Sequence, residues 1–141
     1  MGKSALLLDY PWCMKVLRGG KTWEIRSRPC KKRGRIVIAS TGKTSPNGKA
    51  LQLGEATVTD CIVVGRRREG LLSAPVEAPA NFLFLDEHVE KHQIRDLQEF
   101  PALAAWETVF AWVLENPIEY AVPVALTAKH GCVVWAKAGH V

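Results

Sequence analysis

The segment "RGGKTWEIRSRPCKKRGRIVIAS", residues 18–40, is decisive for the fold because it contains two predicted strands. "KTWEIRSR" alternates, with Trp23 and Ile25 on one face and Glu24 and Arg26 on the other, which is typical of a half-buried strand. "GRIVIAS" is a nearly continuous apolar, β-branched run and predicts a central strand. Eight Lys/Arg surround one acid, Glu24. Glu24 is therefore either half of a surface ion pair, worth about 0–1 kcal/mol, or part of a site.

Further strands are predicted on both sides of this segment from short apolar runs. Pro117 and Pro123 lie in one of these runs, and proline in a strand indicates an edge. The runs that we assign to strands are "SALLLDY" (4–10), "GEATVTDCIVVG" (54–65), "PIEYAVPVALT" (117–127) and "GCVVWAKA" (131–138).

Three helices are expected between the strands. "PWCMKVLRGG" has Pro11 in a first-turn position and ends in Gly-Gly, the asymmetry of a short helix. A second, mostly charged helix is expected from about Asp86 to Gln98. A third is expected to open at Pro101, because apolar residues recur at helical spacing after it. Those residues are Leu103, Trp106, Val109, Phe110 and Val113. The whole pattern predicts one α+β domain, residues 1–141, on a curled sheet or small barrel.

Charge is distributed unevenly along the 141 residues. Residues 1–68 hold 15 Lys/Arg against 4 Asp/Glu, a net of +11, whereas residues 69–141 hold 4 against 10, a net of −6. A basic half of this density is typical of proteins with a phosphate-bearing partner. No apolar run is long enough to span a membrane, and the N-terminal run is too short for a signal peptide. We therefore expect an intracellular protein of the cytoplasm or nucleus, not a membrane protein.

Motifs for metals and nucleotides fail on spacing, so we predict no metal and no cofactor. The four cysteines are scattered without a C-x-x-C pair. His88 and His92 are at i, i+4, but Val89 breaks the H-E-x-x-H pattern, which leaves a surface histidine pair. "GKT" at Gly42–Thr44 resembles the end of a P-loop, but Val37 stands where the loop needs glycine. Lys43 is then a plain loop cation that can touch phosphate.

Gly19–Arg26 matches G-x-K-x-x-E-x-R, the signature of the ASCH domains in the PUA-like superfamily. The neighbouring "YPWCMKVLRGGK", "RGRIVIAS" and "LGEATVTDC" and the terminal "GCVVWAKA" also resemble that family. The resemblance covers the first 65 residues and the last 20, not the helical middle. It implies a PUA-like small β-barrel of about five to six strands with peripheral helices, and a cleft beside the signature strand. It also implies that the cleft binds nucleic acid, most of all RNA.

The resemblance carries Lys21, Glu24 and Arg26 over as cleft residues. Trp12, from the matching Pro-Trp, is expected either to stack on a base at the mouth, worth about 1–3 kcal/mol, or to pack in the core. Trp23 has the opposite parity to Glu24 and is assigned to the core. A basic face is expected to follow the phosphates. Its residues are Arg26, Arg28, Lys31, Lys32, Arg33 and Arg35, with Lys43 on the loop.

Two other functions stay open. One branch of the family hydrolyses N4-acetylcytidine with a Lys, a Thr and a Glu. Its Lys falls on Lys21, but Glu24 stands where it has Thr, so this sequence departs from that branch. A small hydrolase of an acylated nucleoside or of RNA, with Lys21 and Glu24 catalytic, is the alternative. A third hypothesis is a protein partner that binds the acidic segment 86–99; no oligomeric state is predicted.

Overall fold

The chain forms two compact units. The computed structural model describes residues 4–68, 71–73, 88–95, 102–103, 106–126 and 135–137. Unit 1 comprises residues 1–20, 33–58 and 115–141, and unit 2 comprises residues 21–32 and 59–114. Two long strands, β4 (Leu51–Arg68) and β6 (Thr108–Ala125), each contribute to both units. The prediction of one domain over residues 1–141 stays a prediction.

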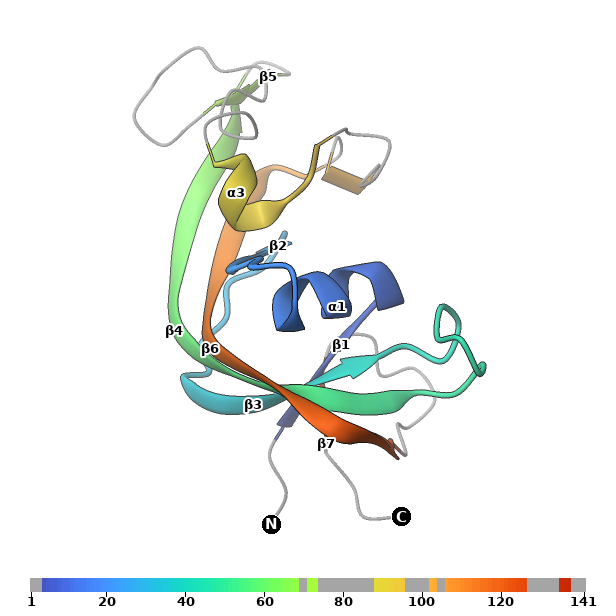
Figure 1. The fold of residues 1–141 in the computed structure, drawn as a ribbon. Coiled ribbons are helices and arrows are strands. Elements are labelled where there is room, and N and C mark those ends of the chain that lie inside the picture. Colours follow the sequence, from blue (N-terminus) through green and yellow to red (C-terminus); the bar gives the residue numbers. More distant parts are fainter. Residues whose placement is uncertain are drawn as a thin grey trace. The chain divides into compact units, whose positions relative to one another are not determined.

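Unit 1 is built on β1 (Ser4–Leu8), β3 (Gly34–Ser40) and β7 (Trp135–Lys137), with parts of β4 and β6 (Figure 1). β3 pairs in parallel with β1 and antiparallel with β4, and β7 pairs antiparallel with β1. Residues 36–40 of β3 are all buried, as expected for a strand with neighbours on both sides. The prediction of a central strand is therefore confirmed.

Helix α1 (Tyr10–Leu17) packs on β1 and β3 through Cys13, Val16 and Leu17, which are buried. Pro11 lies in its first turn, as predicted. Thr44 of the "GKT" triplet caps it, because its Oγ1 accepts a hydrogen bond from the Tyr10 N–H at 2.8 Å. No helix in the described part of the chain is long and apolar enough to cross a membrane.

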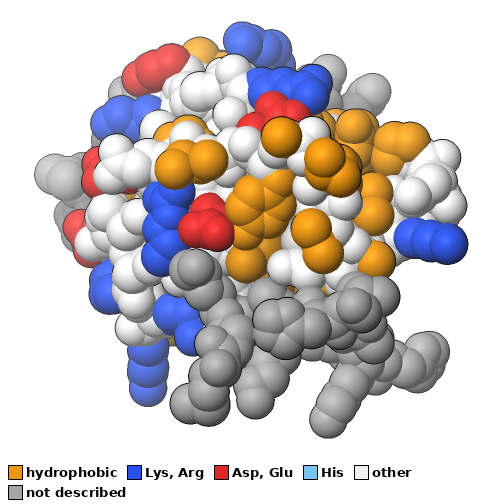
Figure 2. All heavy atoms as spheres, turned by 60° about the horizontal axis from the view of Figure 1, so that its bottom comes forward, with side chains coloured by type: hydrophobic (Ala, Val, Ile, Leu, Met, Phe, Trp, Pro, Cys, Tyr) orange, Lys and Arg blue, Asp and Glu red, His pale blue; other side chains and the backbone are white. Residues whose placement is uncertain are grey.

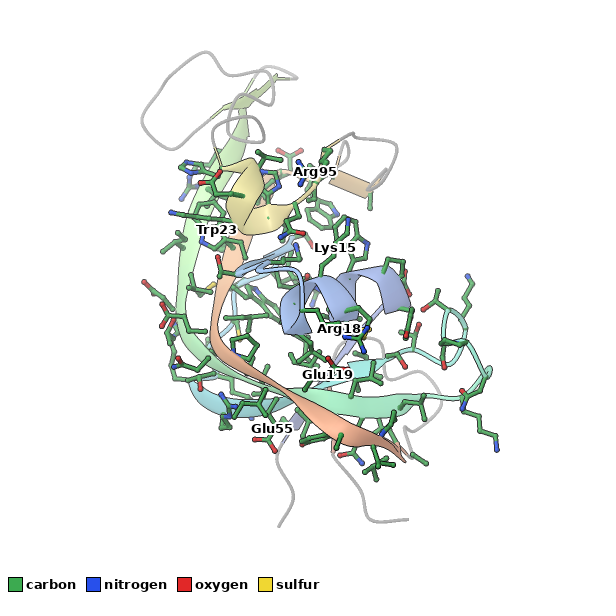
Figure 3. All side chains as sticks on the ribbon, viewed as in Figure 1. Lys15, Arg18, Trp23, Glu55, Arg95 and Glu119 are labelled. Atoms are coloured by element: carbon green, nitrogen blue, oxygen red, sulfur yellow. The ribbon has the colours of Figure 1, made fainter. Side chains whose placement is uncertain are left out.

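The part of β6 in unit 1, residues 115–125, is highly exposed. Its large apolar side chains Ile118, Val122 and Val124 are 60%, 72% and 45% exposed. Figure 2 shows a face on which apolar side chains gather beside Lys/Arg and Asp/Glu. Glu119, on the same strand, pairs with Arg18 after α1 at 2.6 Å, and Figure 3 shows the two side chains pointing toward one another. In the sheet order β6 lies between β2 and β4, and β2 pairs only with its residues 110–113, so the edge strand predicted over residues 117–127 stays a prediction.

Unit 2 contains β2 (Trp23–Arg26), β5 (Leu71–Ser73) and α3 (Val89–His92). β2 pairs antiparallel with residues 110–113 of β6, and β5 with the end of β4. Trp23 and Ile25 are buried, as predicted from their shared parity. Other members of this core are Val64, Ile94, Leu103, Val109, Ala111 and Leu114.

Two helix predictions are corrected. The helix predicted from Pro101 is wrong over residues 108–113, which lie in β6. These residues match a helical period, but "TVFAWV" is rich in β-branched and aromatic residues, and pairing with β2 decides in favour of the strand. The helix predicted from about Asp86 to Gln98 is α3 alone in the described residues. Gln93 has φ 57°, in the left-handed region, and this ends the helix.

The α+β class is confirmed, but a closed barrel is not. The paired strands follow the order β2-β6-β4-β3-β1-β7, with β5 on β4. Among the described residues no pairing joins β2 to β7, so the sheet is open at both ends. β2 is only four residues long, all four pair with β6, and the signature strand lies at one end of this order.

Candidate functional site

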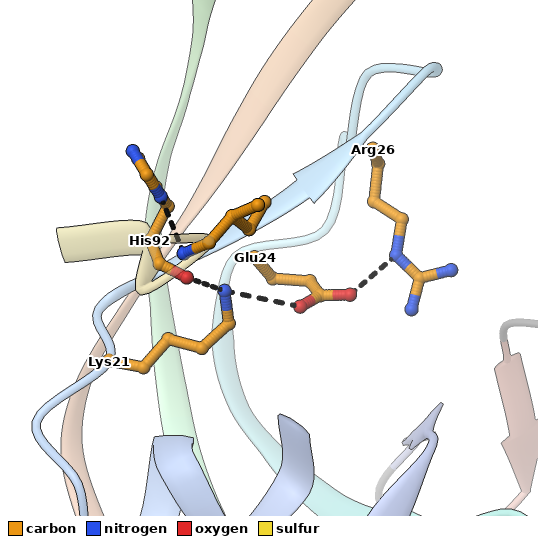
Figure 4. Close-up of polar contacts among 5 residues, drawn as sticks. Lys21, Glu24, Arg26 and His92 are labelled. Atoms are coloured by element: carbon orange, nitrogen blue, oxygen red, sulfur yellow. Dashed lines mark hydrogen bonds and ion pairs between the residues drawn. The ribbon is translucent and has the colours of Figure 1, made fainter. Parts of the chain in front are cut away.

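The polar face of β2 carries a buried carboxylate between two cations. Glu24, 5% exposed, accepts a hydrogen bond on Oε2 from Arg26 Nε at 2.8 Å. Its Oε1 lies 3.9 Å from Lys21 Nζ (Figure 4). The side chains of Lys21 and Glu24 are both nearly inaccessible, whereas that of Arg26 is partly exposed. The three predicted cleft residues are thus brought together, but two of them are buried.

Lys21 is held by a segment more than seventy residues away in the chain. Its Nζ donates a 2.6 Å hydrogen bond to the carbonyl oxygen of His92, and the Thr22 N–H donates to the Lys91 carbonyl at 2.9 Å. His92 is fully buried, and its Nδ1 accepts the N–H of Ile94 at 2.9 Å. That bond takes an N–H which a continuing helix would have used, so the turn after α3 and the position of Lys21 are linked.

Trp112 lies opposite Glu24 in the β2–β6 pairing. Its ring centroid is 5.6 Å from Cζ of Arg26, and its Nε1 donates to the carbonyl oxygen of Arg28 at 2.8 Å. Trp112 thereby supports both arginines that follow Glu24. The helix predicted over residues 108–113 gives Trp112 no place beside Glu24; the β-branched and aromatic content of this run is the sequence signal that indicates a strand there.

The arrangement leaves Glu24 able to accept another hydrogen bond. At 3.9 Å, Lys21 Nζ is farther from Oε1 than a hydrogen bond reaches. A carboxylate oxygen has two lone pairs, and Arg26 occupies only the other oxygen. A ligand N–H aimed at Oε1 would meet an acceptor that two cations already hold in place.

Three further predicted residues belong to the loop that follows β2 in unit 2. Arg28, Lys31 and Lys32 are exposed, while Cys30 between them is buried. The buried Cys30 side chain anchors this loop to the protein, while the three cationic side chains of the loop are exposed to solvent. Their suitability for phosphate rests on charge and exposure.

Unit 1 holds the other predicted residues. Arg33 and Lys43 are exposed, and Trp12 is partly buried with Lys15 Nζ 4.4 Å from its ring centroid. This contact leaves both alternatives for Trp12 open. Arg35, in contrast, is engaged within the protein, as the next network shows.

A second acid–cation network surrounds Glu55 in unit 1. Arg35 Nε lies 3.2 Å from Glu55 Oε1, and Arg35 Nη1 donates to Thr57 Oγ1 at 3.0 Å and to the Asn116 carbonyl at 2.6 Å. Tyr120 Oη donates to Glu55 Oε2 at 2.7 Å. Burial, the bond to Glu55 and its negative charge raise the pKa of Tyr120 to about 12. Because three acceptors already bind Arg35, it is a weaker candidate for contacting phosphate than the cations of the loop after β2.

No group of three or more metal-ligating side chains is found within the described residues. The predicted surface histidine pair is corrected, because His92 is fully buried. His88 packs against Trp23 in a tilted arrangement, with the ring centroids 4.9 Å apart. The two histidines therefore serve packing and backbone hydrogen bonding.

Comparison with known proteins agrees with the signature. A crystal structure of ASCH from Zymomonas mobilis has a TM-score of 0.58 at 16% identity, over 82% of this chain and 68% of that one. A tyrosine-to-phenylalanine variant of the protein from that organism gives 0.60 at 17%, over 88% and 76%. A serine-to-alanine variant gives 0.59 at 16%, over the same shares. At such identities the likeness shows the fold.

Among the curated proteins, none matches the chain. The ASCH domain family matches residues 6–124, which includes the middle of the chain that the resemblance left uncovered. The chain therefore belongs to the ASCH domain family.

Proposed function

We propose that the protein binds RNA, with Glu24 accepting a hydrogen bond from a base and the following loop contacting phosphates. The observation that carries this proposal is the buried Glu24, fixed between Lys21 and Arg26 with acceptor capacity left on Oε1. The ASCH domain family is generally thought to bind RNA, which supports the choice of ligand. Such a ligand would place the protein in the cytoplasm or nucleus.

A carboxylate acceptor suits the edge of an unstacked base. Sequence-specific RNA recognition mostly targets single-stranded bases that are hydrogen-bonded on their edges. Amino and imino N–H groups on those edges are donors, and a carboxylate in a low-dielectric site accepts them strongly. Lys21 and Arg26 would hold the Glu24 side chain oriented while the base approaches Oε1. We assign Glu24 to base recognition and Lys21 to positioning.

The exposed cations of the loop supply the electrostatic part of binding. Arg28, Lys31 and Lys32 are exposed and follow directly on β2. Each phosphate contact to single-stranded nucleic acid adds about 0.7 to the slope of log affinity against log salt. Arg33, Arg35, Lys43 and Trp12 remain predicted contacts; Arg35 is the weakest of them.

The test is titration of short single- and double-stranded RNA and DNA at about 50 and 200 mM salt, which separates electrostatic from base contacts. Removal of two loop charges in Lys31→Gln/Lys32→Gln is expected to weaken binding of every sequence and to reduce the salt slope by about 1.4. Lys49→Gln is a single-charge control, because Lys49 is an exposed lysine outside the proposed surface. Glu24→Gln is expected to change base preference, once circular dichroism has shown that it folds.

Each other outcome has a definite meaning. Undetectable binding at about 50 mM salt contradicts the proposal, since electrostatic binding is strongest there. Turnover of acylated cytidine or RNA that is lost in Lys21→Met would then favour the hydrolase. Capture of a protein partner that is lost on charge reversal in residues 86–99, with RNA binding intact, would favour an interaction domain.

A further inference from the structure

Two cysteines meet where the basic loop returns to the sheet. Cys30, in the loop after β2, is buried, and its backbone N–H donates to Sγ of Cys61 at 3.3 Å. Cys61 lies on β4 and is partly exposed. Both residues belong to unit 2. All three cysteines that the structure describes are thiols.

The distance is compatible with a bond between the two sulfurs. The N and Cα atoms of a residue are about 1.46 Å apart, so Cα of Cys30 lies within about 4.8 Å of Cys61 Sγ. In a disulfide the S–S bond is about 2.05 Å long, which places each sulfur within about 5 Å of the Cα atom of the other residue, as Cys61 Sγ is here. Cys30 Sγ makes a weak 3.7 Å contact to the Lys32 carbonyl. Rotation of the Cys30 side chain toward β4 would exchange this contact for a bond to Cys61 Sγ.

We propose that Cys30 and Cys61 form a reversible disulfide by exchange with a small-molecule disulfide such as oxidised glutathione. The partly exposed Cys61 thiolate attacks the glutathione disulfide, forms a mixed disulfide and releases one glutathione thiolate. The Cys30 thiolate then attacks Cys61 Sγ and displaces the second glutathione thiolate. The protein loses two protons and two electrons, and one oxidised glutathione becomes two reduced ones. The product ties the loop bearing Arg28, Lys31 and Lys32 to β4.

Cys13 is a control within the same chain. It is fully buried under α1, and its sulfur donates to the Tyr10 carbonyl at 2.9 Å. Burial raises the pKa of Cys13 to about 12. The thiolate is the species that exchanges, so Cys13 is expected to stay reduced under the same conditions.

The experiment equilibrates the folded chain in buffers of oxidised and reduced glutathione, blocks remaining thiols with an alkylating agent, and maps tryptic peptides by mass spectrometry. The expected product joins peptide 27–31 to peptide 50–66, with the loss of two hydrogen atoms. Dithiothreitol should restore both peptides. The oxidised protein is expected to melt several degrees higher, because the bond restricts the unfolded chain. Cys61→Ser and Cys30→Ser should each abolish the linked peptide and the shift in melting temperature.

Three results would overturn the proposal. One is glutathione retained on Cys61 with Cys30 alkylated, which means that Cys30 does not reach it. The second is linkage of either residue to Cys132 in place of the other. The third is full alkylation of both thiols at every glutathione ratio. The wild-type peptide map gives all of these answers without a variant, and it is independent of RNA binding.

Discussion

Glu24 and Glu55 are two carboxylates on strands, each bound by an arginine, yet their surroundings differ. The side chain of Glu24 is 6% exposed and forms ion pairs with Arg26 and with Lys21. The Lys21 side chain is 1% exposed. Glu55 has a 22% exposed side chain, and its second oxygen accepts from the neutral hydroxyl of Tyr120. The more deeply buried Glu24 has two cations nearby, whereas the partners of the more exposed Glu55 include one arginine and a neutral hydroxyl.

The difference determines what each network tolerates. A buried ion pair is weak evidence for stability, but loss of one partner leaves the other charge buried and unpaired. Solvent screens a partly exposed pair, and its loss leaves groups that water can reach. The Glu24 network should therefore be much less tolerant of substitution, as expected if it is maintained for a ligand.

The largest expected effect is that of Glu24→Gln. Lys21 would retain its bond to the His92 carbonyl but lose the nearby negative charge. We expect the free energy of unfolding to fall by about 3–5 kcal/mol, measured by urea denaturation. A loss below about 1 kcal/mol would contradict the comparison and mean that water already reaches this pair.

The control for that measurement is Glu119→Gln. It removes the same charge from a pair with Arg18, whose side chain is 66% exposed. Its unfolding midpoint is expected to match that of the wild type. The bond from Arg18 lowers the pKa of Glu119, so any stabilisation is present above the carboxyl pKa of the unfolded chain and is lost as the pH falls through the folded value.

An intermediate effect is expected for Glu55→Gln. Arg35 keeps Thr57 Oγ1 and the Asn116 carbonyl as acceptors, and the amide oxygen can still accept from Tyr120. We expect a loss of about 1 kcal/mol in the free energy of unfolding, from the same urea titration. A loss as large as that in Glu24→Gln would show that the burial of the two networks does not set their tolerance.

The smallest effect concerns the phenol of Tyr120. Its pKa is raised from 10.0 to about 12, so the folded state binds the proton more tightly than the unfolded state. This contribution to stability is complete below about pH 10 and is lost as the pH rises through about 12. Phenolate absorbance should show the late titration in the wild type, an earlier one in Glu55→Gln, and none from this site in Tyr120→Phe. An unchanged titration in Glu55→Gln would show that Glu55 does not contribute to the raised pKa of Tyr120.

Much of the strand pattern was predictable because it is local. The β-branched run in β3 and the alternation in β2 carry their own periodicity, and Pro11 indicates the start of α1. The helix prediction failed at residues 108–113 because a short apolar run fits both the helical and the strand period. Only pairing with β2 selects the strand. The helix expected over residues 86–98 failed because the left-handed Gln93 and the His92 side chain stop α3, and neither effect has a sequence signal.

The sequence by itself determined the family, through Gly19, Lys21, Glu24 and Arg26, and the separation of a basic from an acidic half. Only the tertiary structure decided that Lys21 donates a hydrogen bond to the His92 carbonyl and that Glu24 is buried. It also decided that Trp112 contacts Arg26 and the Arg28 carbonyl. The two hydrogen bonds join residues 71 and 84 positions apart. Their partners are mostly backbone carbonyls, which every residue carries, so side-chain identity alone does not reveal them.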